Sequence, residues 1–219
     1  MKNIVLSSLI AATALTPALN AAPATLLEIA GAAWPAARLS SSVLIIVDAQ
    51  REYAEGKLPL ACIDDAVSNI ATLLTRARTA GTPIIHVVQL NPKNRPIFAE
   101  DSPMAEIFPA LAPRAGEVVI PKQLPNSFAG TSLDATLQKL GRKDLIIVGF
   151  MTHMCVSATV RSALDHGYRS TAVASCCATR DLPDGLGGIV AASDVHRMEL
   201  AALRDRFAAI ARSPDEIGD

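Results

Sequence analysis

The chain has 219 residues, of which 50% are hydrophobic and 19% are charged, so it is long and apolar enough to fold as one domain and is not intrinsically disordered. Lys and Arg number 20 and Asp and Glu number 21, a net charge of -1. This balance excludes the broad basic surface that nucleic acids or anionic membranes attract. The 4 cysteines are too few for a disulfide scaffold.

The N-terminus has the features of a secretory signal. Lys2 precedes an apolar stretch from Ile4 to Leu15, and small residues continue to Ala21. Residues 1–21 are therefore expected to be removed on export to the periplasm or the medium. Polar residues interrupt the stretch, which makes it a poor membrane span. The alternative is an Ala-rich extension of a cytoplasmic protein, and the cysteine count does not decide between the two.

Apolar runs and helical spacing alternate along the rest of the chain. Short aliphatic runs, typical of strands buried on both faces, predict strands at 43–47, 84–90, 117–120, 145–148 and 171–174, with a last strand at 208–210. Apolar residues at helical spacing predict helices at 63–80, 133–140, 155–166 and 193–206. The proline-rich stretch 91–113 is expected to form a long functional loop with a short helix at 104–108.

This alternation predicts an α/β fold: a doubly wound, mostly parallel sheet of five to six strands with helices on both faces. Ligands bind such sheets beyond the carboxyl ends of the strands. Asp48 follows the first predicted strand, Lys122 follows the third, and Cys155 follows the fourth. A carboxylate, a cation and a thiol are therefore expected to meet at one edge of the sheet.

These residues favour catalysis in which the sulfur of Cys155 acts as the nucleophile. Cys155 lies at the predicted start of a helix, where the dipole and unpaired N–H groups favour a thiolate and a lowered thiol pKa. Asp48 is placed to take the thiol proton, and Lys122 to stabilise charge on thiolate and substrate. The sequence has no motif for dinucleotide binding, for a phosphate-binding loop or for a serine nucleophile elbow. The spacing of its His, Cys and acidic residues does not match a zinc site. No spacing supports a redox pair of Cys155 with Cys176 or Cys177.

Three stretches carry more specific motifs: Val-Asp-Ala-Gln at 47–50, Lys122 with Ser-Phe-Ala-Gly-Thr-Ser-Leu at 127–133, and Gly-Phe-Met-Thr-His-Met-Cys-Val at 149–156. Together they resemble the isochorismatase-like cysteine hydrolases, the superfamily that includes nicotinamidases. The resemblance implies a triad of Cys155, Asp48 and Lys122. It also implies a cis peptide bond between Phe150 and Met151, and an oxyanion hole formed by the backbone N–H groups of Met151 and Cys155.

The resemblance spans one hydrolase domain over residues 25–212, with one departure. Nicotinamidases carry metal-binding Asp and His residues just after the second strand, where this chain has Val88 to Pro92 with no carboxylate or imidazole. No metal or other cofactor is therefore expected, and His86, inside that strand, is expected to be packed. Isochorismatases that cleave a vinyl ether lack the nucleophilic cysteine, so the presence of Cys155 favours acyl chemistry.

The sequence thus predicts a metal-independent cysteine hydrolase that cleaves a small amide or related C–N bond through an acyl-enzyme. The alternatives are a non-catalytic binding or scaffold protein of the same fold and an isochorismatase-type ether hydrolase. The expected partners are a small-molecule substrate and further copies of the chain, as a dimer or tetramer, with no nucleic acid and no membrane. His166 and His196 are expected at the helix surface. The substrate pocket is expected to include Gln50, Tyr53, Phe128, Thr152 and His153.

Overall fold

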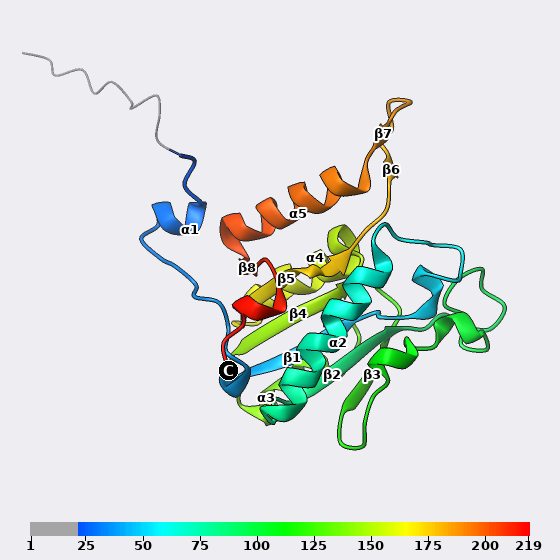
Figure 1. The fold of residues 1–219 in the computed structure, drawn as a ribbon, viewed down its shortest axis with the longest axis horizontal. Helices are drawn as coiled ribbons and strands as arrows, with labels where there is room; N and C mark the ends of the chain where they lie inside the picture. The colour runs from blue at the N-terminus through cyan, green and yellow to red at the C-terminus, as the bar shows by residue number, and fades with distance from the viewer. Residues whose placement is uncertain (1–21) are drawn as a thin grey trace, which may run out of the picture.

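The computed structural model describes residues 22–219, so the predicted signal at residues 1–21 lies outside the described residues. Its centre is a six-stranded parallel sheet in the order β3-β2-β1-β4-β5-β8 (Figure 1). The strands are β1 (Ser42–Val47), β2 (Ile84–Gln89), β3 (Val118–Lys122), β4 (Asp144–Phe150), β5 (Arg169–Ala178) and β8 (Ala208–Ala211). A separate antiparallel hairpin joins β6 (Leu182–Pro183) to β7 (Ile189–Val190). The expected α/β fold is confirmed.

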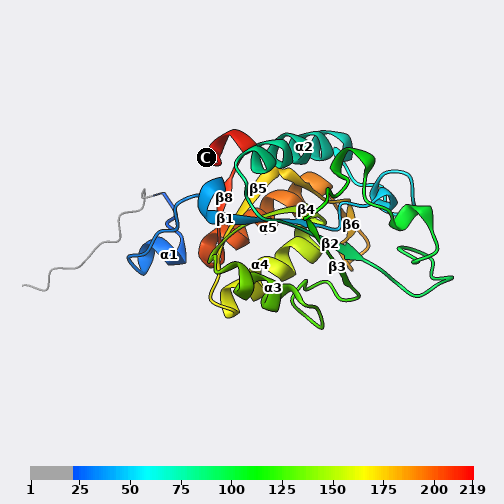
Figure 2. The same ribbon diagram turned by 90° about the horizontal axis from the view of Figure 1, so that it is seen from below.

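Helices cover both faces of the sheet. Figure 2 shows α2 on one face and α3 with α4 on the other. The α-helices are α1 (Leu26–Ile29), α2 (Ile63–Thr79), α3 (Leu133–Leu140), α4 (Ser157–Asp165) and α5 (Ala192–Arg206). Shorter 3-10 turns occupy Leu39–Ser41, Arg51–Tyr53, Pro103–Ala105, Pro109–Leu111 and Pro214–Glu216, and a π-helical turn spans Thr152–Val156. Within residues 22–219, no helix combines the length and apolarity that crossing a membrane requires.

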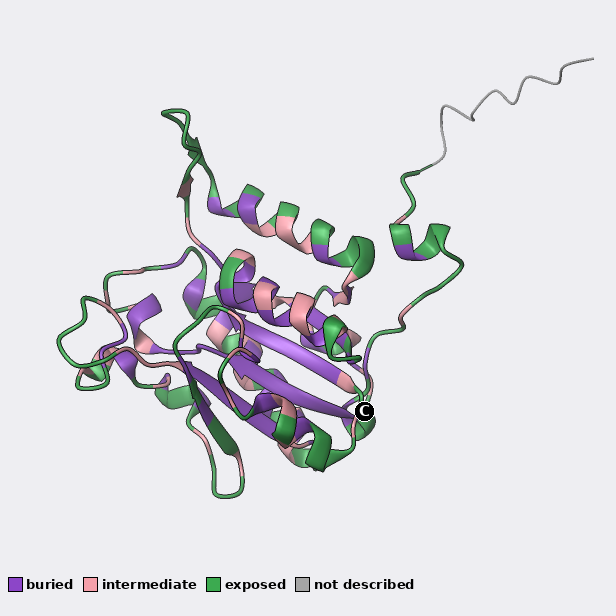
Figure 3. Ribbon diagram, turned by 180° about the vertical axis from the view of Figure 1, so that it is seen from behind, coloured by how far each residue is buried: buried purple, intermediate pink, exposed green. Residues whose placement is uncertain are grey.

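Two hydrophobic cores, one on each face, explain the continuous apolar run of β1. Leu44 and Ile46 pack in the core beneath α2, whereas Val43, Ile45 and Val47 pack in the core beneath α3 and α4. Successive side chains of a strand point to opposite faces, so a strand covered on both sides needs apolar residues throughout. Figure 3 shows the central strands as the buried interior of the domain, whereas the edge strand β3 is largely exposed.

Several strand ends differ from the predicted ones, and the differences in β3 and β5 lie near the expected site. Lys122 is the last residue of β3 and does not follow the strand. β5 continues to Ala178 because a bulge lets its second half pair again with Gly149 and Phe150 of β4. An extra segment of this kind breaks the alternation that identifies a strand in sequence.

Short elements were also missed or misplaced by the sequence pattern. The expected helix at 104–108 is replaced by two 3-10 turns, each with a proline in its first turn, Pro103 and Pro109. The two-residue strands β6 and β7 are too short to show any periodicity.

Gly149 lies where β4 passes closest to β1. Its φ is +118°, and a Cβ at this position would collide with the backbone oxygen of Val47. A side chain of any size would therefore push apart two neighbouring strands of the buried sheet, just before the turn that carries Cys155.

We expect Gly149→Ala to reduce the free energy of unfolding by more than about 3 kcal/mol, because a methyl group cannot fit without moving backbone. The matched control is Gly141→Ala, since Gly141 also has a positive φ, 67°, but nothing lies within 4 Å of the position that its methyl group would take. That control should lose only about 1–2 kcal/mol, the ordinary cost of a left-handed non-glycine residue. Urea unfolding measures both values, and equal losses would contradict the steric explanation.

Candidate active site

Asp48, Lys122 and Cys155 meet at the carboxyl edge of the sheet, from the ends of β1, β3 and β4. Lys122 Nζ lies 2.7 Å from Asp48 Oδ2 and donates a hydrogen bond to Cys155 Sγ at 3.3 Å. All three side chains are buried. The peptide bond between Phe150 and Met151, which precedes the turn carrying Cys155, is cis as expected.

The Lys122 ammonium has a third polar neighbour, the side chain of Gln89. Lys122 Nζ donates to Gln89 Oε1 at 2.8 Å, and the parallel register of β2 and β3 places the two residues side by side. An ammonium group has three donors, and Asp48, Cys155 and Gln89 are three close polar neighbours of this one, Asp48 as an ion pair and the other two as hydrogen-bond acceptors. Sequence reasoning assigned Gln89 no catalytic role. Gln89 and Lys122 end two adjacent parallel strands, and this pairing is the feature that would have pointed to Gln89.

A chain of side-chain amides connects Gln89 to the proline-rich loop. Gln89 N–H donates to Gln50 Oε1 at 2.8 Å, and Gln50 Nε2 donates to the carbonyl oxygens of Gln89 at 2.9 Å and Ala105 at 2.7 Å. Gln89 Nε2 donates to Asn91 Oδ1 at 3.0 Å, and Asn91 Nδ2 donates to the Ile97 carbonyl at 2.9 Å. Gln50, expected in the pocket, thus fastens the loop beside the triad.

The residues after β2 do not fit the metal site of nicotinamidases. The amides of Gln89 and Asn91 are engaged with protein partners, and neither residue carries a charge that would compensate a cation. In the part of the chain that the structure describes, no group of three or more His, Cys, Asp or Glu is placed to hold a metal ion. His86 is buried, with Nε2 2.9 Å from Glu117 Oε2.

The thiol of Cys155 is held in its protonated form. Burial raises its pKa to about 12; the negative charge of Asp48 adds to the rise and the positive charge of Lys122 opposes it. The expectation of a lowered pKa is wrong, because burial and the charge of Asp48 outweigh the effect of Lys122 on the thiol. Burial also raises the pKa of the Asp48 carboxyl, against the opposing effect of Lys122. A protonated thiol therefore lies near a carboxylate of increased basicity.

The two aromatic residues expected in the pocket occupy different places. Tyr53 is buried against the rings of Phe98 and Phe150, with centroids 5.2 and 5.7 Å away. Burial raises the pKa of Tyr53 well above its usual value, and the charges of Asp48 and Cys155 add to the rise, which places Tyr53 close to the triad.

Phe128 lies instead in the packed core. Its ring stacks on the imidazole of His166 at 4.7 Å and near the ring of Tyr168 at 6.0 Å. Ordinary packing therefore accounts for this side chain.

Thr152 and His153 tie the turn that carries the thiol to the end of β5. Thr152 Oγ1 donates to the Ala178 carbonyl at 3.1 Å and lies 2.9 Å from His196 Nδ1. His153 Nδ1 lies 2.6 Å from Thr179 Oγ1. Placing His196 at the surface was wrong: it is half-buried and supports the turn from α5.

Known proteins share this fold and much of this sequence. The family model described as Isochorismatase domain matches residues 42–215. A crystal structure of an isochorismatase from Pseudomonas putida KT2440 is 45% identical, has a TM-score of 0.86, and covers 90% of this chain and 100% of that chain. The secreted isochorismatase effector Isc1 of Verticillium dahliae is 40% identical over 179 residues, which are 82% of this chain and 92% of that protein. Maleamate amidohydrolase of Pseudomonas putida is 31% identical over 153 residues, 63% of this chain and 72% of that protein. The chain therefore belongs to the isochorismatase family and is a hydrolase of that family.

Proposed function

We propose that this hydrolase cleaves a small amide or a related C–N bond, without a metal ion, through a covalent intermediate on Cys155. The observation that carries the proposal is the buried Lys122 ammonium, 2.7 Å from an oxygen of Asp48 and 3.3 Å from the sulfur of Cys155. The relative named maleamate amidohydrolase supports amide chemistry.

Acylation requires the Cys155 thiol to lose its proton during the attack, because the resting thiol is protonated. Asp48 takes the proton as the sulfur of Cys155 attacks the carbonyl carbon and forms a C–S bond. The oxyanion is stabilised by the backbone N–H groups of Met151 and Cys155. When the intermediate collapses, the C–N bond breaks and Asp48 gives its proton to the departing amine, which leaves a thioester on Cys155.

Deacylation repeats these steps with water as the nucleophile. Asp48 removes a proton from water as its oxygen attacks the thioester carbonyl. The C–S bond then breaks, the proton returns to the sulfur, and the carboxylic acid leaves. Lys122 balances the charge that moves between carboxylate and sulfur in both halves, and its three fixed contacts hold it in place without reorganisation.

A substrate screen with two readouts tests the proposal. Maleamate and other small primary and substituted amides are incubated with the enzyme, before and after exhaustive chelation, and released ammonia or amine is measured. We expect turnover that survives chelation, together with a Cys155 peptide heavier by the acyl group in quenched reactions. Isochorismate cleavage that persists in Cys155→Ala, with no release of amine from any amide, would instead support ether hydrolysis.

Gln89 provides a test of the charge-balancing step. We expect Gln89→Leu to lower kcat/KM by about tenfold, because one buried proton of Lys122 loses its acceptor and the ammonium is no longer fixed. The matched control is Gln138→Leu, the same change at an exposed position on α3, which should leave kcat/KM unchanged. Steady-state kinetics on the amide found in the screen measures both, and equal values for the two variants would contradict this role.

We also propose that the protein acts as a homo-oligomer. Large apolar side chains are exposed on the β6–β7 hairpin and on α5: Leu186 is 92% exposed, Ile189 75% and Met198 63%. The hairpin projects from the body of the domain in Figure 1. Exposed apolar groups on a projecting hairpin and on the helix that follows it are typical of a contact surface between chains. Light scattering on the purified protein gives the number of chains.

Export is proposed on two grounds: the composition of residues 1–21, and similarity to a relative named as secreted. We expect the mature protein from its native host to begin close to residue 22. N-terminal sequencing measures this directly. A chain that retains Met1 and is recovered from the cytoplasm would contradict export.

A further inference from the structure

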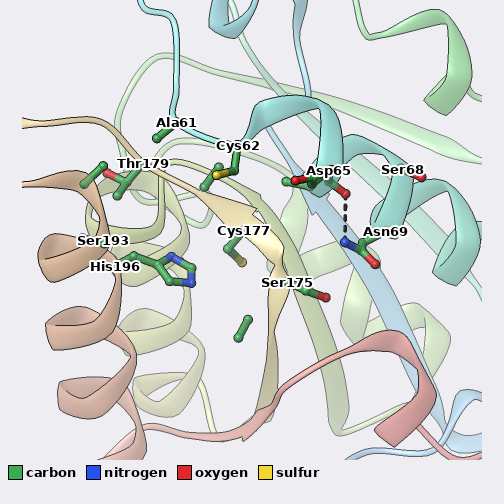
Figure 4. Close-up of a pocket in the computed structure, with 14 residues that line it drawn as sticks. Ala61, Cys62, Asp65, Ser68, Asn69, Ser175, Cys177, Thr179, Ser193 and His196 are labelled. Carbon is green, nitrogen blue, oxygen red and sulfur yellow. Dashed lines mark hydrogen bonds between the residues drawn. The ribbon is translucent and has the colours of Figure 1, made fainter.

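A cavity of about 610 Å³ lies beside β5 between α2 and α5, and none of the triad residues lines it (Figure 4). Sheet topology accounts for it. β8 pairs with β5 only over residues 170–173, whereas β5 continues to Ala178. Ser175 N–H still donates to the Arg212 carbonyl at 3.0 Å, and beyond Ser175 this edge of β5 has no neighbouring strand among residues 22–219. The space is lined by many small side chains, which leave it open: Ala61, Ala66, Ala174, Ala178 and Ala192.

His196 presents a hydrogen-bond acceptor to this cavity. The hydroxyl of Thr152 has one proton and donates it to the Ala178 carbonyl at 3.1 Å. The 2.9 Å contact between Thr152 Oγ1 and His196 Nδ1 must therefore be donated by Nδ1–H. Burial lowers the pKa of His196, so its ring is neutral at neutral pH and Nε2 carries a lone pair. Figure 4 shows the ring extending from α5 into the cavity.

The other lining groups favour an uncharged ligand. The Ser175 hydroxyl is buried and has no hydrogen-bond partner among the described residues. Burial raises the pKa of the Cys177 thiol to about 12, so that thiol stays neutral. Asp65 is the one acidic side chain of the lining and belongs to an exposed residue of α2. A mostly apolar wall with a few convergent polar groups, in a volume of about 300–1,000 Å³, is typical of small-molecule sites.

We propose that this cavity is a second small-molecule site, which takes an uncharged compound with an apolar body and one hydroxyl or N–H donor. The donor binds Nε2 of His196, and the apolar body lies against the free edge of β5. The site stands apart from the proposed amide chemistry, so its test needs no turnover.

A pair of fluorinated probes tests the donor requirement. 4-Fluorophenol has an apolar ring, one O–H donor and no charge at neutral pH, and 4-fluoroanisole is the same ring with the donor methylated. We expect ¹⁹F NMR titration to show that the phenol binds the wild-type protein about twofold to tenfold more tightly than the ether, the net effect of one hydrogen bond. Equal affinity of the two probes would overturn the proposal.

Variants then locate the site. His196→Phe keeps a ring but removes the acceptor, so the two probes should bind it equally. Asn69→Trp places a large side chain in the cavity and should abolish binding of both probes, whereas Thr72→Trp, at an exposed position on the same helix, should leave binding intact. Cys155→Ser should bind as the wild type does. Binding that survives Asn69→Trp, or that is lost in Cys155→Ser, would overturn the assignment, and thermal melting checks that each variant is folded.

Discussion

Replacing Cys155 by alanine is expected to abolish turnover on the enzyme's amide substrate while leaving the fold nearly unchanged. Cys155 is 7% exposed, and removing one sulfur from its turn deletes the nucleophile but no backbone hydrogen bond. Without a thiol no thioester forms, and neither Asp48 nor Lys122 supplies a replacement nucleophile in the proposed mechanism. Steady-state kinetics gives the loss, and thermal melting confirms the fold.

The matched controls are the other buried thiols, Cys176 and Cys177. Both have pKa values raised by burial, as Cys155 has, but neither contacts Lys122. Cys176→Ala and Cys177→Ala should therefore keep most of the activity if they remain folded. Undiminished turnover by Cys155→Ala would contradict the covalent mechanism outright.

Asp48→Asn is expected to lower kcat/KM by at least about 10²- to 10⁴-fold, the usual contribution of a general base. Asparagine keeps the size of the side chain but cannot accept the thiol proton. Lys122→Met should also slow the reaction, for a different reason, because it removes the cation that balances the charge. The two variants should therefore be distinguishable by the state of the Cys155 thiol.

The rate of Cys155 alkylation against pH distinguishes them and needs no substrate. The negative charge of Asp48 raises the thiol pKa and the positive charge of Lys122 lowers it. Asp48→Asn should consequently shift the profile to lower pH, and Lys122→Met should shift it to higher pH, from a wild-type pKa of about 12. Peptide mapping separates Cys155 from the exposed Cys62. Profiles that superimpose on the wild type would contradict the electrostatic coupling.

The sheet was predictable from sequence because its central strands are buried on both faces. The run Val43 to Val47 has no polar interruption, and the helix after it shows apolar residues at helical spacing up to its end near Gly81. Parallel topology alone then predicted that Asp48, Lys122 and Cys155 lie at one edge of the sheet. The structure brings Lys122 Nζ within 2.7 Å of Asp48 and 3.3 Å of Cys155.

Properties that depend on burial or on register could not be predicted in the same way. The pKa of Cys155 follows from desolvation and from the charge of Asp48, whereas sequence shows only a helix following a strand. The role of Gln89 depends on its pairing with Lys122 across two strands. His196 was misplaced because an amphipathic helix pattern does not reveal that Thr152 reaches it from another element.

The amide chain from Lys122 through Gln89 and Asn91 bears on how this enzyme could be given a new specificity. Exchanging the proline-rich loop is the natural way to reshape the substrate site, since loops on rigid scaffolds carry recognition. Here the first residues of that loop also fix the Lys122 ammonium, through Asn91 and the Ile97 carbonyl. A grafted loop that starts at residue 91 would alter charge balance together with selectivity. A graft that begins after Ile97 and retains Asn91 would change selectivity without changing charge balance. Designed loops for this hydrolase should therefore start after residue 97.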